Sequence, residues 1–337
     1  LEPEEFEPSV KEDLSYEEEH VDLVKTVASG FHQGNGGKGS DSGFKFICVD
    51  PLSNSVETPA DVLLARVRDF SRIQFCIVSC EVGEDPIKQW INNINEVHDV
   101  FSDSDHQDEL MDNLEIQNRR LDAIQYVTLV KQKDWEGHRF PTVSKQIDPS
   151  DFAIWSVAVE GDQELCHEEG QLIHKDLKDV VEDCFDSLNT QNPIEFTSTT
   201  DSIIPLEEIV YELVYEKRQI EESEHPLEFT FEEFQEEFER KLKLGMPEDE
   251  RETVIEEKSL EVLNMGKDIG LISEGNVRSN DNDYRIMYRG SDDCTTARNN
   301  TRQKYVEDAA ISKMQSQALK LADDDFETDQ TGFDRFL

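Results

Sequence analysis

The sequence predicts an α/β N-terminal domain with a mostly parallel sheet, followed by a mainly helical domain. Three observations lead to this fold class. Between residues 44 and 190, β-branched and aromatic runs alternate with amphipathic segments. A polar, turn-rich stretch, "NTQNPIEFTSTTDS", follows at 189–202. Beyond it, apolar residues recur at helical spacing.

Three runs read as buried strands, at 44–50 ("FKFICVD"), 72–82 ("RIQFCIVSCEV") and 151–162 ("DFAIWSVAVEGD"). The segments around them predict helices at 57–70, from Asp85 onward, at 108–131 and at 168–188. Strands that alternate with helices need crossover connections, so we expect a largely parallel sheet.

Local signals support two of these helices. For the segment 57–70, Thr58 is the expected N-cap, Pro59 the first helical residue and Asp61 the partner in a capping-box-like pair. The helix after Asp85-Pro86 places its apolar residues on one face: Ile87, Trp90, Ile91, Ile94 and Val97.

We divide the chain into four consecutive parts. Residues 1–43 form an acidic, loosely ordered lead and a flexible Gly-rich linker, 44–190 the α/β domain, 203–290 the helical domain, and 291–337 a helix with an acidic tail. The linker contains "GNGGKGS", which lacks the GxxxxGK[ST] spacing and does not follow a strand. It therefore indicates a flexible loop and not a phosphate-binding loop.

The chain is strongly acidic, with 77 Asp and Glu against 33 Lys and Arg in 337 residues, a net charge of −44. Such a surface repels phosphates and membrane headgroups and favours basic partners. Adaptation to high salt, mimicry of a polyanion and acidic interaction segments each remain open as its cause.

No apolar run approaches the ~20 residues of a membrane helix, and no signal peptide is visible. The six cysteines contain no CxxC pair and do not resemble a disulfide framework, so we expect reduced thiols. These features favour a cytoplasmic or nuclear-type reducing compartment over secretion or a membrane.

The helical domain has an ordered series of features. "FTFEEFQEEFERKLKLG" predicts a helix that begins with the capping box of Thr230 and Glu233, and "LEVLNMGKDIGLIS" and "DYRIMYRG" follow. This order over residues 228–290 resembles a winged-helix module. The resemblance implies nucleic-acid contact through a helix and a wing, where Arg278, Arg285 and Arg289 are the candidates.

Charge argues against base reading by this module. The helix that would enter the groove carries Glu256, Glu257 and Glu261, which phosphates repel. A protein-binding winged helix therefore fits better, and the arginines can instead partner the acidic excess.

The final residues, "QTGFDRFL", resemble the sliding-clamp-binding peptide called a PIP box. Gln330 and Phe336 match its glutamine and first aromatic positions, whereas Phe333 stands at the aliphatic position and Leu337 replaces the second aromatic. One helical turn would place Phe333, Phe336 and Leu337 on one side as an apolar plug for a groove on a partner.

Carboxylates follow the three predicted strands: Asp50, Glu81, and Glu160 with Asp162. Ligands gather at the carboxyl ends of strands in open α/β sheets, and such acids bind Mg²⁺ or Mn²⁺ for phosphoryl transfer. In a chain this acidic, an acid after a strand also occurs by chance, and no Lys follows Glu81 or Glu160 at nuclease-like spacing.

Other candidates for chemistry are weaker. Cys76 and Cys80 lie four apart on one strand and read as buried thiols. Cys166, His167 and His174 lack the spacing of a zinc site, so no metal is assigned to them.

Three functions follow. The first is a non-enzymatic accessory or adaptor protein in DNA replication, repair or genome maintenance, which binds a sliding clamp or another basic protein and needs no cofactor. The second is a metal-dependent, nuclease-like enzyme that uses the strand-end carboxylates. The third is an acidic nucleic-acid mimic or viral-type cofactor.

Overall fold

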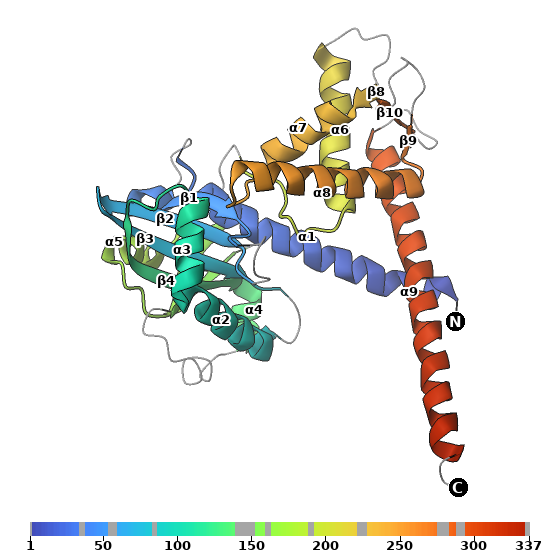
Figure 1. Ribbon diagram of the computed structural model, residues 1–337, viewed down its shortest axis with the longest axis horizontal. Helices are drawn as coiled ribbons and strands as arrows, with labels where there is room; N and C mark the ends of the chain where they lie inside the picture. The colour runs from blue at the N-terminus through green and yellow to red at the C-terminus, as the bar shows by residue number, and fades with distance from the viewer. Residues whose placement is uncertain are drawn as a thin grey trace. The chain divides into compact units, whose positions relative to one another are not determined.

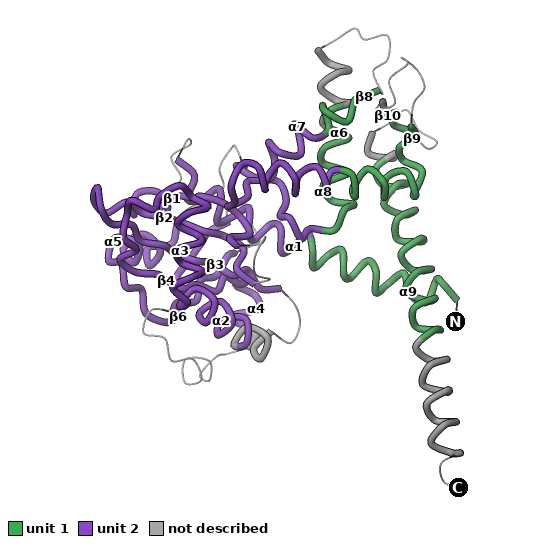
Figure 2. Tube along the Cα trace, viewed as in Figure 1, with its two compact units in different colours: residues 1–17, 201–234, 260–337 green, residues 18–200, 235–259 purple. Residues whose placement is uncertain are grey.

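The computed structural model describes residues 2–33, 38–52, 59–82, 86–138, 152–158, 163–187, 192–220, 228–274, 283–287 and 294–333. It contains two compact units, which Figure 2 colours separately. Unit 1 comprises residues 1–17, 201–234 and 260–337, and unit 2 comprises residues 18–200 and 235–259. Unlike the consecutive domains of the sequence analysis, both units are assembled from separate stretches of the chain.

Unit 2 is built on a sheet that has seven strands within the described residues, in sequence order from β1 to β7. The β3–β4 and β4–β5 pairs are parallel, and the other four neighbouring pairs are antiparallel. Figure 1 shows this sheet. Its strands are β1 (Lys45–Val49), β2 (Val62–Asp69), β3 (Arg72–Cys80), β4 (Arg120–Lys131), β5 (Phe152–Val157), β6 (Glu164–Gly170) and β7 (Phe185–Asp186).

The three predicted strands are confirmed as β1, β3 and β5, but the expectation of a mostly parallel sheet is wrong because the sheet is mixed. The expected helix at 57–70 is strand β2, which pairs with strands on both sides. Its residues Val62–Leu64 are fully buried. Burial between two strands overrides the helix propensity of its Leu, Ala and Arg residues.

The long helix expected at 108–131 is also wrong. Helix α3 (Ser104–Asn113) ends early, Glu115 takes a positive φ of 55°, and strand β4 follows. The run "IQYVTLV" in β4 is β-branched and aromatic, as is typical of a parallel strand that is buried on both faces.

The expected helix at 168–188 divides into three elements: the end of β6, helix α5 (Lys175–Glu182) and β7. The break falls at Gly170, which has a φ of +92°. A Cβ atom there would lie 2.4 Å from the carbonyl oxygen of Phe152, so only glycine fits this turn.

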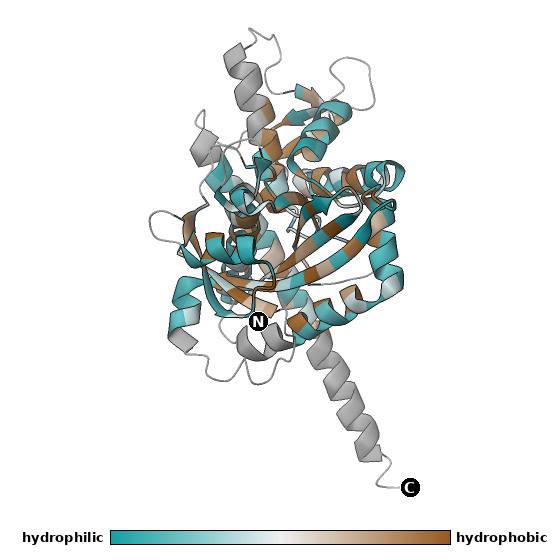
Figure 3. Ribbon diagram, turned by 90° about the vertical axis from the view of Figure 1, so that its left-hand side faces the viewer, coloured by the Kyte–Doolittle hydropathy of each residue, from teal (hydrophilic) through white to brown (hydrophobic). Residues whose placement is uncertain are grey.

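Two further helices lie between strands of this sheet in the sequence: α2 (Pro86–Ser102), which confirms the prediction after Asp85, and the short α4 (Gln132–His138). Ile94 and Val97 of α2 are buried as expected. Apolar residues gather on the strands, and the helices carry more polar surfaces (Figure 3). The core includes Phe75 and Phe101, and Trp155 of β5 stacks on Phe31.

The N-terminal acidic stretch is ordered, contrary to expectation. A 3₁₀ turn (Pro3–Glu5) precedes helix α1 (Glu7–Gly30), and a second one, η3 (Lys38–Ser42), follows it. Val24, Val27 and Ala28 of α1 are fully buried, so an apolar stripe stabilises this helix despite its acidic sequence.

The expectation of reduced thiols holds for part of the cysteines. Cys48, Cys76 and Cys80 are free and buried, whereas Cys166 of β6 forms a disulfide with Cys184. The register of β6 on β7 brings these two residues together, which their separation of 18 residues does not reveal.

The C-terminal region is mostly helical. Its helices are α6 (Ile203–Ile220), α7 (Phe231–Lys241), α8 (Glu248–Asp268) and α9 (Cys294–Phe333). Strands β8 (Glu228–Thr230), β9 (Ile272–Glu274) and β10 (Asp283–Ile286) form an antiparallel sheet in the order β8-β10-β9. Among the described residues, none of the helices has the length and apolar content that crossing a membrane requires.

The predicted capping box at the start of α7 is confirmed. The Glu233 amide donates to Thr230 Oγ1 at 3.1 Å, and the Thr230 amide donates to Glu233 Oε2 at 2.7 Å. Phe234, Phe238 and Leu242 are buried, as the predicted apolar face requires. Local sequence therefore determines where this helix begins.

Candidate active site at the end of the sheet

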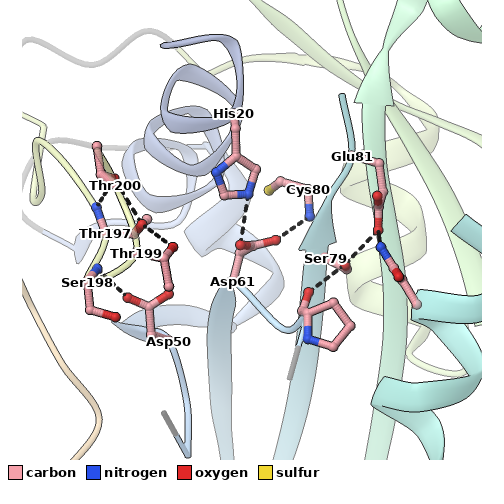
Figure 4. Close-up of polar contacts among 12 residues, drawn as sticks. His20, Asp50, Asp61, Ser79, Cys80, Glu81, Thr197, Ser198, Thr199 and Thr200 are labelled. Atoms are coloured by element: carbon pink, nitrogen blue, oxygen red, sulfur yellow. Dashed lines mark hydrogen bonds and ion pairs between the residues drawn. The ribbon is translucent and has the colours of Figure 1, made fainter. Parts of the chain in front are cut away.

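Three carboxylates meet at one end of the sheet of unit 2. Asp50 directly follows β1, Asp61 directly precedes β2, and Glu81 directly follows β3. Because β2 is antiparallel to β1 and β3, its first residue lies beside the last residues of both neighbours. Figure 4 shows the three acids in a row, with Asp61 in the middle.

Asp61 connects the sheet to helix α1. Its Oδ2 accepts a hydrogen bond from the Cys80 amide at 2.6 Å, and its Oδ1 lies 2.9 Å from Nε2 of His20 (Figure 4). The side chain is thus held by the neighbouring strand and by a titratable ring.

Asp50 occupies a turn with unusual backbone geometry. Its φ is +48° and that of Leu52 is +67°, in the left-handed region. Asp50 Oδ2 accepts a hydrogen bond from the Ser198 amide at 2.7 Å, and Thr197 and Thr200 close the same turn through their hydroxyls at 3.0 Å. Left-handed non-glycine residues concentrate at functional sites, where the surrounding contacts hold them.

Glu81 is held by neutral donors. Its Oε1 accepts hydrogen bonds from Asn93 Nδ2 at 2.8 Å and from Ser79 Oγ at 3.1 Å. Ser79 Oγ is also 2.6 Å from the carbonyl oxygen of Pro59, the residue that the sequence analysis placed in a helix.

Burial determines the protonation of these acids. Desolvation raises the pKa of Glu81 to about 7 and that of Asp50 to about 6. These pKa values include the opposing effect of the hydrogen bonds from Asn93 and Ser198. They also include a smaller increase from the charge of Asp61 and a decrease from His20. Perturbed carboxylates that influence one another at the end of a sheet are typical of functional sites.

A buried lysine, Lys131, lies at the end of the neighbouring strand β4. Lys131 ends β4 with its side chain 5% exposed, and its Nζ is 2.5 Å from Glu19 Oε2 on α1. The Glu81 amide donates to the carbonyl oxygen of Leu129, two residues before Lys131, so Glu81 and Lys131 lie on adjacent strand ends. Their side chains point to opposite faces of the sheet, because Lys131 pairs with Glu19 of α1 and Glu81 accepts a hydrogen bond from Asn93 of α2.

Of the four predicted catalytic candidates, the structure brings Asp50 and Glu81 together, and Glu160 and Asp162 lie outside the described residues. Sequence reasoning missed His20, Asp61 and Lys131. Asp61 was assigned to a helix, and His20 and Lys131 come from elements whose placement beside the acids depends on tertiary packing. The signal available for Asp61 was its position directly before a run of four apolar residues.

The cysteine and histidine candidates lie in different environments, and the disulfide of Cys166 departs from the expected reduced thiol. Burial raises the pKa of Cys76 and Cys80, which keeps both thiols protonated. Cys166 is in a disulfide, so it offers no thiolate, and burial lowers the pKa of His174 to about 4. Within the described part of the chain, no group of three or more His, Cys, Asp or Glu has an arrangement that could hold a metal ion.

The remaining predicted sites are only partly described. Arg285 lies on β10 and is exposed, whereas Arg278 and Arg289 fall outside the described residues. Gln330 and Phe333 lie in the last turn of α9, where only the backbone is described. Phe336 and Leu337 lie outside the described residues.

Comparison with known proteins adds no relative. No family model matches the chain, and no curated protein or solved structure shows significant similarity to it.

Proposed function

We propose that unit 2 is a divalent-cation-dependent hydrolase that acts on phosphate esters, with Asp61 and Glu81 as the cation-binding acids. The observation that supports this most is the row Asp50, Asp61 and Glu81, three acids at most 9% exposed at one sheet end. Mg²⁺ and Mn²⁺ prefer carboxylate oxygens, and Mg²⁺ is often held by one or two carboxylates together with substrate phosphates.

The energetics favour a cation here. A buried carboxylate is costly unless a positive charge or several hydrogen bonds stabilise it. Among the described side chains, no lysine or arginine forms an ion pair with Asp50 or Glu81. A divalent ion would therefore replace the protons that the raised pKa values retain.

The neighbouring groups suit phosphate chemistry. When bound, the ion would polarise a phosphoryl oxygen and lower the pKa of a water molecule. The ammonium of Lys131 is already paired with Glu19 on the face covered by α1, so we assign it no contact with the phosphate. His20, hydrogen bonded to Asp61, is a candidate to accept the proton of the attacking water.

Ion binding is tested first, by titrating Mn²⁺ in a calorimeter at pH 8. We expect wild-type binding, its loss in Asp61→Asn and Glu81→Gln, and tighter binding as pH rises through 7, because Glu81 must lose its proton. Asp108→Asn, an exposed carboxylate on α3, is the matched control and should bind normally. Equal binding by all four proteins would remove the acids from the proposed site.

Hydrolysis is tested with bis(4-nitrophenyl) phosphate, a small phosphodiester. We expect Mn²⁺-dependent turnover that falls at least about 100-fold in Asp61→Asn and in Glu81→Gln. The wild-type protein could bind the ion through these acids and still hydrolyse no substrate. That result would limit the site to a structural role.

We also propose that the region 228–290 is a protein-docking, winged-helix-like module. The small antiparallel sheet with the strand order β8-β10-β9, all of it within unit 1, supports it. Glu256, Glu257 and Glu261 of α8 are exposed, which favours a basic protein over phosphates as the partner.

The C-terminal peptide is the second part of this docking proposal. The helical backbone of α9 through Phe333 supports a helix-in-groove mode of binding. The test is surface plasmon resonance on a purified sliding clamp. Binding should be lost in Phe333→Ala and retained in Asp329→Asn, and equal signals would discard the clamp as the partner.

A further inference from the structure

Two cavities in unit 2 lie along β1. The first, of about 350 Å³, has an apolar wall that includes Ile47, Val67, Ile73 and Ile116. The second, of about 410 Å³, lies between β1 and the segment Lys243–Pro247. Ile47 and Leu114 line both cavities, so the two are neighbours. We call them together the β1 cleft.

The cleft has the opposite charge balance to the chain. The first cavity is lined by Lys45 and Arg119 and by no acid. The second is lined by Lys243 and Arg251 against Glu115 and Glu248. In a protein with 77 acids and 33 bases, a concave surface with more bases than acids favours an anionic ligand.

Buried donors in the cleft have no acceptor. Arg119 Nη1, Asn113 Nδ2 and Arg251 Nε are buried and make no hydrogen bond, although Arg251 Nε is 3.6 Å from Glu239 Oε1. A buried donor without an acceptor costs about 1–3 kcal/mol. Because Arg251 Nε faces the Glu239 carboxylate, Arg119 Nη1 and Asn113 Nδ2 are the two donors that remain without an acceptor at the wall of the cleft.

The cleft leads toward the carboxylate row. Cys48 and Gly245 line the second cavity, and Asp50 follows Cys48 by two residues. The Val49 amide donates to the carbonyl oxygen of Lys243 at 2.8 Å, which holds the cationic segment against this end of β1. Asp50 itself lines neither cavity, so the β1 cleft and the carboxylate row are neighbouring but separate features.

We propose that the β1 cleft binds a single nucleic-acid strand, with one base in the apolar cavity and the adjoining phosphates on Arg119, Lys243 and Arg251. This inference rests on the proposed function and names its substrate class. A cavity of this size takes a single base, which a duplex keeps stacked and paired. Apolar base contacts combined with a cationic groove are typical of single-strand binding.

The test measures binding without cleavage. The fluorescence anisotropy of labelled 20-nucleotide probes is measured in EDTA over a series of salt concentrations. The probes are oligo-dT, oligo-rU, duplex DNA and a strand of abasic spacers. We expect wild-type protein to bind dT or rU, and to bind the duplex and the abasic strand about tenfold more weakly. The dT and rU arms distinguish DNA from RNA as the source of the strand.

Protein variants locate the strand. Lys243→Gln combined with Arg119→Gln should weaken binding and lower the salt slope by about 1.4, since each phosphate contact contributes about 0.7. Lys178→Gln, an exposed base on α5, is the matched control and should bind as wild type. The single variant Lys243→Gln provides the measurement if the double variant is unstable.

The outcomes separate the two proposals. No strand binding by wild-type protein, or equal slopes in all variants, would overturn the β1 cleft as the site. Binding that depends on Lys243 and Arg119 but is unaffected by Asp61→Asn supports the cleft. Strand binding of this kind would support the β1 cleft even if the protein hydrolyses no phosphate ester. The hydrolase proposal can therefore fail while the strand-binding proposal stands.

Discussion

Two buried glutamates, one in each unit, differ in what surrounds them. Glu207 of α6 has a fully buried side chain, and in unit 1 it pairs with Arg302 at 3.0 Å and Arg298 at 3.1 Å, both on α9. Glu81 in unit 2 is 4% exposed and receives hydrogen bonds from the neutral side chains of Ser79 and Asn93. Burial raises the pKa of both, but two arginines oppose the shift only at Glu207.

The difference is whether arginines satisfy the buried carboxylate. Glu207 joins two helices through charge pairs that satisfy it within the protein. Glu81 keeps its proton near neutral pH and has a neighbouring acid, Asp61, that raises its pKa further. Under the proposed function, this acid would bind a divalent ion that the fold itself does not replace with a lysine or arginine.

The largest effect is expected from removing the structural acid. Glu207→Ala should lower the free energy of unfolding of unit 1 by about 3 kcal/mol, because it leaves Arg298 and Arg302 without their shared acceptor. Urea denaturation and hydrogen exchange of α6 and α9 measure the loss. Glu208→Ala is the control: Glu208 is 32% exposed and meets Arg298 alone, so a loss under ~1 kcal/mol is expected. Similar losses in the two variants would contradict the structural role of Glu207.

The next effect concerns the pH dependence of unit 2. The pKa of Glu81 is raised from 4.5 to about 7, so its contribution to stability is complete below pH 4.5 and is lost as pH rises through 7. The loss is about 3 kcal/mol in the absence of divalent ions, because each pKa unit corresponds to 1.36 kcal/mol. Glu81→Gln should flatten this part of the curve, measured by urea denaturation at pH 5, 6, 7 and 8. Parallel curves for the two proteins would show that Glu81 is ionised in the folded state at every pH tested.

The smallest effect is expected at an exposed ion pair. Lys178 and Glu182 of α5 are 3.4 Å apart, and each side chain is about half exposed. Lys178→Gln should change the free energy of unfolding by less than about 0.5 kcal/mol, because solvent already screens this pair. Thermal denaturation at low and high salt is the measurement. A loss comparable to that of Glu207→Ala would show that burial does not set the order of these effects.

Prediction from sequence succeeded where the signal was local. The Thr230–Glu233 capping box determines the start of α7, and the β-branched runs at β1, β3 and β5 were identified. It failed at β2, whose leucines, alanine and arginines favour helix in isolation, and at β4, whose β-branched run was assigned to the preceding helix. Pairing with strands on both sides decided their conformation, and a single segment carries no information about its pairing partners.

The candidate site shows the same division. Asp50 and Glu81 were found because each directly follows a recognisable strand. Asp61 was misplaced with β2, and Lys131 was missed because β4 was assigned to a helix. Arg119, Lys243 and Arg251 are far apart in sequence, so their common cleft could not be foreseen.

The amino-acid sequence by itself determined the acidic charge, the central strands and the helix caps, because these depend on composition and on residues within a few positions of one another. The tertiary structure alone decided the mixed strand order, the Cys166–Cys184 disulfide and the grouping of Asp50, Asp61 and Glu81. These depend on which distant segments pair, and pairing is set by burial of the whole sheet rather than by any one segment.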